Sequence, residues 1–100
     1  MWHAVVEGAD KRSMTDRPAH ILADLEPLLL RAHAQGDDAT LVRLYTQVAD
    51  AREAGGDVDG ACFYLTHAYV FALQSGAAQT DMLNLRLYQH GREPRYEFTA

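Results

Sequence analysis

The chain has 100 residues, of which 48% are hydrophobic and 23% charged, a balance typical of one small globular domain rather than of a disordered segment. Fourteen acidic residues against nine basic ones give a net charge of −5. This charge argues against nucleic-acid binding, which needs a basic surface to neutralise phosphates. The single cysteine, Cys62, excludes an internal disulfide and a cysteine-rich zinc site.

The stretch before Met14 mixes charged and small residues and contains no apolar segment of the length that an export signal requires. We therefore expect residues 1–13 to form a flexible leader before a single helical domain over residues 14–91. The missing export signal and the single thiol favour a cytoplasmic location.

Glycines divide the sequence at regular intervals, because Gly36, Gly56 and Gly76 lie twenty residues apart and the first two are followed at once by aspartate. Glycine is favoured just after a helix, where it adopts a left-handed backbone, and aspartate is favoured as the N-cap of the next helix. No alternating run of the kind that forms strands is present. The sequence thus predicts an all-α fold, a bundle of about four helices in up-down order.

The first helix is expected from Pro18 to Gln35, with Thr15 or Asp16 as its cap. Its buried face is predicted from apolar residues at three- and four-residue spacing: Ile21, Leu25, Leu28, Leu29 and Ala32. Pro27 has no N–H to donate within the helix, so we expect a kink or a break there.

The second helix is expected from Ala39 to Ala54, capped by Asp37 or Asp38. Its apolar face comprises Leu41, Leu44, Tyr45, Val48 and Ala49. The fourth helix is expected from Thr80, its predicted cap, to His90, and residues 92–100 are expected to form a C-terminal tail.

The third helix, from Val58 to Ser75, is unusual because no Asp, Glu, Lys or Arg occurs between Gly60 and Thr80. A helix that is apolar on every side is normally buried on every side. Its dense apolar stretch, Ala61 to Leu73, is too short for a membrane span, which needs about twenty residues.

One motif spans the second and third helices, over residues 40–74. It comprises Tyr45, Val48-Ala49, the Gly56-Asp57 turn, and Ala61, Leu65 and Ala68. This spacing resembles one degenerate tetratricopeptide repeat, a helical hairpin in which small residues let two antiparallel helices approach closely. Arg52 departs from the pattern, because the family usually has tyrosine there.

In that family, the first helix of each pair lines a concave surface that binds extended peptides or partner helices. The resemblance implies that four residues of the second helix face such a groove: Arg43, Thr46, Asp50 and Glu53. A solvated helix face is the alternative interpretation of this polar set.

The apolar surface of the third helix exceeds what three neighbours can cover in so short a chain. We expect the remainder to meet another molecule. The residues predicted to take part are Phe63, Tyr69, Val70 and Phe71.

No catalytic constellation is apparent. Cys62 and His67 are five residues apart on one helix and point about 140° apart, so they cannot form a nucleophile–base pair. We expect Cys62 to be a small buried hydrophobic residue, and we expect no metal or cofactor site.

The sequence therefore predicts a non-enzymatic helical module that binds a protein partner or associates with itself, for instance as a homodimer, without nucleic acid or a membrane span. The alternative is a small enzyme or ligand-binding protein that uses a pocket between the helices near His67, with Tyr64 and Cys62 as further candidates.

Overall fold

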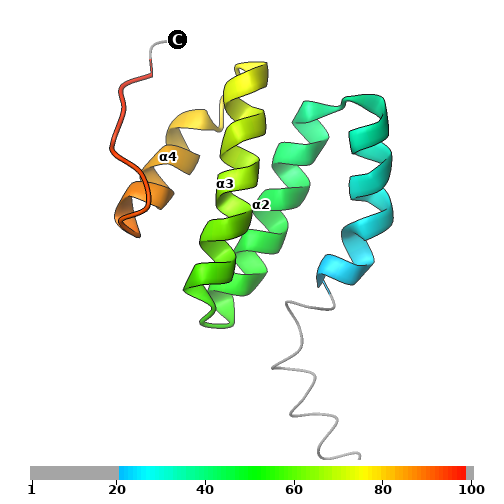
Figure 1. Cartoon of the computed structure of the whole chain (residues 1–100), viewed down its shortest axis with the longest axis horizontal. Coiled ribbons are helices and arrows are strands. Elements are labelled where there is room, and N and C mark those ends of the chain that lie inside the picture. The colour runs from blue at the N-terminus through cyan, green and yellow to red at the C-terminus, as the bar shows by residue number, and fades with distance from the viewer. Residues whose placement is uncertain (1–20, 99–100) are drawn as a thin grey trace, which may run out of the picture.

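The computed structural model of the chain describes residues 21–98, and these contain four helices and no strand. Residues 21–35 form the first helix, which is followed by α2 (Asp38–Ala54), α3 (Val58–Ser75) and α4 (Thr80–Gln89). The helices lie side by side in up-down order (Figure 1), so the predicted all-α bundle is confirmed. The expected leader, residues 1–13, lies outside the described residues, as do Thr15, Asp16 and Pro18.

The predicted Gly–Asp boundaries set the ends of α2 and α3. Asp37 caps α2 by accepting hydrogen bonds from the backbone N–H and the hydroxyl of Thr40, and Asp57 caps α3 by accepting from the N–H of Gly60. These hydrogen bonds hold the pKa of both carboxyl groups below their usual range. At the other end of α3, Gly76 has a left-handed backbone with φ of 68°, which a residue with a Cβ adopts only with strain.

Two local expectations were wrong, and of the kink or break expected at Pro27 the break does not occur. The first helix continues without a break through Pro27, and Leu28 is exposed rather than part of the buried face. Thr80 does not cap α4. It is the first residue of the helix, where its hydroxyl donates back to the carbonyl of Ala77, and the N-cap position is held by Gln79 without a side-chain hydrogen bond.

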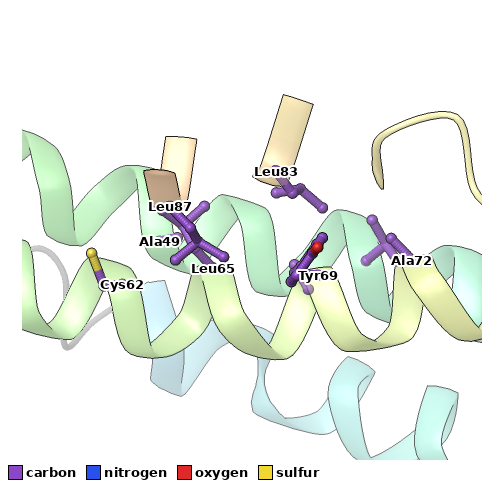
Figure 2. Close-up of a cluster of buried hydrophobic side chains, with 9 residues drawn as sticks. Ala49, Cys62, Leu65, Tyr69, Ala72, Leu83 and Leu87 are labelled. Atoms are coloured by element: carbon purple, nitrogen blue, oxygen red, sulfur yellow. The ribbon is translucent and has the colours of Figure 1, made fainter. Parts of the chain in front are cut away.

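The main hydrophobic core lies where α2, α3 and α4 meet. The alanines at these helix interfaces have no exposed surface, and their small side chains let the helices pack closely. Figure 2 shows Leu83 and Leu87 reaching from α4 toward α3. The buried members of this cluster are Val42, Ala49, Cys62, Leu65, Ala68, Tyr69, Ala72, Leu83 and Leu87.

A smaller core joins the first helix to α2 through Leu29, Ala32, Leu41 and Leu44. Half-buried Tyr45 and Phe71 pack against both clusters. The three neighbouring helices therefore cover α3 from one side only, and its opposite side is left outward.

Candidate interaction surface

The outward side of α3 carries a continuous stripe of uncharged residues. Phe63, Thr66, Val70 and Leu73 form this α3 stripe, and their spacing places them within about 80° of one another around the helix. All four are exposed, with exposed fractions of 57% for Phe63, 42% for Val70 and 47% for Leu73. The hydroxyl of Thr66 donates to the carbonyl of Cys62 in the preceding turn, so its hydrogen bond is made within the helix.

A shallow groove borders the stripe on the side of the C-terminal tail. This tail groove has a volume of about 540 Å³ and lies between α3 and residues 93–98. The residues that line it are Thr66, Tyr69, Val70, Leu73, Glu93, Tyr96, Glu97 and Phe98.

Asn84 of α4 holds the tail that forms this groove. Its side chain is fully buried; the amide nitrogen donates to the carbonyl of Pro94 at 2.9 Å, and the amide oxygen accepts from the backbone N–H of Tyr96 at 3.0 Å and from Arg95 at 2.8 Å. The amide nitrogen also lies 3.4 Å from the hydroxyl of Tyr69. One buried side chain thus satisfies backbone groups of a segment without regular secondary structure.

A second groove, of about 530 Å³, borders the stripe on the side of the first helix. We call it the aromatic groove because five of its eleven lining residues are histidine, tyrosine or phenylalanine. The lining residues are Leu22, Ala23, Glu26, Leu29, Leu30, His33, Tyr45, Arg52, Phe63, Tyr64 and His67.

Tyr45 of α2 organises the base of the aromatic groove. Its ring lies nearly parallel to those of Phe71 and Tyr64, with centroids 6.0 and 6.2 Å away, and its hydroxyl lies 2.9 Å from Nε2 of His33. Burial raises the pKa of the Tyr45 hydroxyl, and the nearby Tyr64 adds to the shift. His67 lies against the Tyr45 ring, while its Nδ1 donates to the carbonyl of Phe63 at 2.9 Å.

The structure separates Cys62 from the aromatic groove. Cys62 is buried in the main core, as expected, and this burial raises the pKa of its thiol, which keeps the nucleophilic thiolate scarce. His67 and Tyr64 both line the groove, so only these two of the three candidates for a ligand pocket lie together. Within residues 21–98, no group of three or more potential metal ligands is present.

The polar set on α2 is partly occupied by contacts with α4. Arg86 of α4 forms ion pairs with Asp50 at 2.8 Å and with Glu53 at 3.0 Å, and His90 donates to Glu53 at 2.9 Å. The hydrogen bond from His90, followed by the charge of Arg86, holds the pKa of Glu53 below its usual range.

Within the described residues, the other two residues of the set form no hydrogen bond or ion pair with α4. Arg43 is exposed on α2, and the hydroxyl of Thr46 donates to the carbonyl of Val42 within the helix. Two of the four residues that the family resemblance implied for a groove, Asp50 and Glu53, therefore hold α4 against α2.

The four α3 residues that were predicted to meet another molecule differ in their exposure. Phe63 and Val70 are exposed, whereas Phe71 is half-buried against Tyr45. Tyr69 is only 6% exposed, so its expected place at the surface was wrong. The reason is the tail, since Phe98 lies edge-on to Tyr69 at 6.4 Å and covers it.

Sequence reasoning missed Leu73, whose three-residue spacing from Val70 could have placed it on the same face. It also missed Asn84, for which the sequence gives no local signal, because its partners lie ten to fifteen residues away.

Comparison of the chain with protein-family models, with curated proteins and with solved structures gives no match. Among the residues that the structure describes, none of the helices combines the length and the apolar character that crossing a membrane demands.

Proposed function

We propose that this chain is a non-enzymatic helical module that binds protein through the α3 stripe. The observation that carries the proposal is the exposed, uncharged row of Phe63, Val70 and Leu73 on a helix with no Asp, Glu, Lys or Arg between Gly60 and Ser75. Contiguous apolar surface of this kind is costly to leave in water and typically marks an interaction site.

The flanking grooves support the same proposal. A partner that covers the stripe would also reach the tail groove and the aromatic groove, which offer concave apolar surface on either side. Protein interfaces are typically built in this way, with exposed aromatic and aliphatic side chains at the centre of a patch and polar residues at its rim.

The resemblance of residues 40–74 to a tetratricopeptide repeat points to the same class of function, because proteins of that family bind peptides and partner helices. In that family the binding surface is formed by the first helix of each pair. Our proposal instead assigns binding to the second, α3, because Asp50 and Glu53 of α2 are engaged with α4. The single cysteine, buried and free, is compatible with the reducing cytoplasm that we propose as the location.

Site-specific photo-crosslinking tests the proposal. A photoreactive phenylalanine analogue at Phe63 is expected to trap discrete products in the native host cells, whereas the same analogue at Gln47, exposed on α2, is expected to trap none. Adding Leu73→Glu to the Phe63 probe should abolish the products without unfolding the chain, because Leu73 is exposed. Equal trapping from both positions, or none from Phe63, would contradict an interaction at the stripe.

The aromatic groove supports a second candidate function, the binding of a small apolar ligand. His67 and Tyr64 line a concavity large enough for one, and ligand pockets are typically apolar with a few polar groups. A ligand there should perturb the NMR signals of His33 and His67 and leave those of His90 unchanged. The absence of any such shift across a fragment library would remove this candidate.

A further inference from the structure

We infer that the partner of the α3 stripe is a second copy of this chain, packed so that the two α3 helices run antiparallel about a two-fold axis. This inference rests on the proposed function and specifies its partner. It is carried by three features: the symmetric spacing of the stripe, the apolar area that the stripe offers together with its neighbours Tyr96 and Leu30, and the lack of charge in the stripe.

The spacing of the stripe is symmetric about its own midpoint. Phe63, Thr66, Val70 and Leu73 follow one another at intervals of three, four and three residues. A two-fold axis perpendicular to the helix at the level of Ala68 therefore places Phe63 against Leu73 of the second copy. The same axis places Thr66 against Val70, so every stripe residue meets a stripe residue. Such self-complementarity is what a symmetric dimer interface requires.

The antiparallel arrangement also fills the tail groove. Leu73 of one copy lines its tail groove, and Phe63 of the other copy packs against this Leu73. Phe63 therefore lies at the edge of the groove. Phe63 is 57% exposed, the largest exposed fraction among the large apolar residues of α3, and it is the side chain best placed to fill a concavity. The two-fold axis repeats this contact at both ends of the interface.

The area of the patch suits a dimer of ordinary size. A half-exposed aromatic side chain offers on the order of 100 Å², since such side chains bury 150–250 Å² in full. Phe63 and Tyr96 with Val70, Leu73 and Leu30 thus offer roughly 400 Å² of apolar surface, and a standard interface of about 800 Å² per partner is a little more than half apolar.

The distribution of charge favours a second copy over a charged partner. The stripe itself has no charge, so it gives a basic or acidic partner no counterpart at the centre of the contact, and the carboxylates of Glu93 and Glu97 lie at its edge, in the lining of the tail groove. Outside the stripe both copies are acidic, with a net charge of −5 each, and they repel each other weakly. Salt screens this repulsion, so the dimer should tighten from low to moderate ionic strength, whereas binding to a basic protein would weaken.

Analytical ultracentrifugation of the full chain tests the inference. The wild-type chain is expected to sediment as a concentration-dependent dimer. Val70→Asp, at the centre of the stripe, should raise the dimer dissociation constant roughly 30-fold or more, the effect of losing a central desolvated contact. Met82→Asp is the matched control, since Met82 is an equally exposed apolar residue on α4 and its change should leave the dimer intact. Circular dichroism of both variants verifies that they fold.

Cysteine crosslinking tests the orientation in a Cys62→Ala background. The two-fold antiparallel pair brings position 63 of one copy beside position 73 of the other, while the two copies of position 63 lie about 15 Å apart along the helix. A mixture of Phe63→Cys and Leu73→Cys chains should therefore form a mixed disulfide under mild oxidation, and neither chain alone should form a dimer. Disulfides from each chain alone would indicate a parallel pair and overturn the arrangement.

Two outcomes separate this inference from the proposed function. A wild-type chain that stays monomeric at its highest soluble concentration, while the Phe63 probe traps a different protein, overturns the inference and leaves the proposed function standing. A dimer that Val70→Asp does not weaken, together with no trapping from Phe63, overturns both.

Discussion

Removing the Asn84 side chain should release the C-terminal tail from the helices. The Asn84→Ala change leaves two backbone groups of the tail without partners, the N–H of Tyr96 and the carbonyl of Pro94. It also removes the acceptor that Arg95 reaches at 2.8 Å. The tail of the variant can then adopt one of two states. It either stays packed against the helices with unpaired polar groups, or it detaches and its polar groups bind water.

The magnitudes favour detachment. A buried polar group left unpaired costs about 1–3 kcal/mol, so for these two part-buried backbone groups a docked tail would lose at most about 2–6 kcal/mol. Detachment forfeits three good hydrogen bonds at a net value of about 1 kcal/mol each and the contact of Phe98 with Tyr69, but it regains about 1–2 kcal/mol of backbone entropy for each freed residue. We therefore expect the tail to detach and the free energy of unfolding to fall by no more than about 3 kcal/mol.

Amide hydrogen exchange measures the outcome at the Tyr96 N–H, which donates to Asn84 in the wild-type chain. Its protection should fall roughly tenfold or more, since 1.4 kcal/mol corresponds to a factor of ten. Gln89→Ala is the control, because Gln89 is an exposed amide on the same helix and its loss should leave the tail protected. A variant whose Tyr96 amide keeps wild-type protection would refute the assignment of Asn84 as the anchor of the tail.

Two further changes test the core and the charged contact between α2 and α4. Leu65→Ala, at a side chain with no exposed surface, should lower the free energy of urea unfolding by about 2–5 kcal/mol, whereas Leu28→Ala, at an exposed side chain, should change it by less than about 0.5 kcal/mol. Because the folded-state pKa of Glu53 lies below the ordinary value of 4.5, its ionised form adds stability above that value, which is lost as the pH falls through the folded-state pKa. Below pH 4.5, the melting temperature of Glu53→Gln should therefore fall less steeply with decreasing pH than that of the wild type. Parallel plots of melting temperature against pH would contradict the contact with His90.

Local signals were sufficient to predict α2 and α3. The aspartate caps, the glycine ends and the apolar spacing all lie within a few residues of the boundaries that they specify. The predicted range of α3, Val58–Ser75, matches the structure, and that of α2 differs by one residue at its start. Signals of this kind act through the backbone of the same turn and need no knowledge of the tertiary fold.

The features that sequence reasoning missed depend on contacts between distant residues. Tyr69 is buried because the tail returns along α3 and places Phe98 against it, and the tail returns because Asn84 supplies partners for its backbone. The charged pairs between Glu53 and α4 cross 33 to 37 positions of sequence. Periodicity along one helix shows how many sides are apolar, but which side stays outward is decided by where the neighbouring segments lie.

The sizes of the side chains on the two sides of α3 bear on why its surface is apolar. Four of the six buried α3 residues are alanine or cysteine, whereas the outward stripe contains phenylalanine, valine and leucine. Burying a large side chain stabilises a fold more than burying an alanine. Selection for folding alone would therefore favour large apolar residues on the inward side of α3 and small ones on the outward side. Small inward residues let α2 and α4 approach α3 closely, while Phe63 and Leu73 contribute little to the isolated fold because about half of each remains in water. Polar residues at these two positions would cost the monomer little, and their apolar character is accounted for if a second molecule covers them.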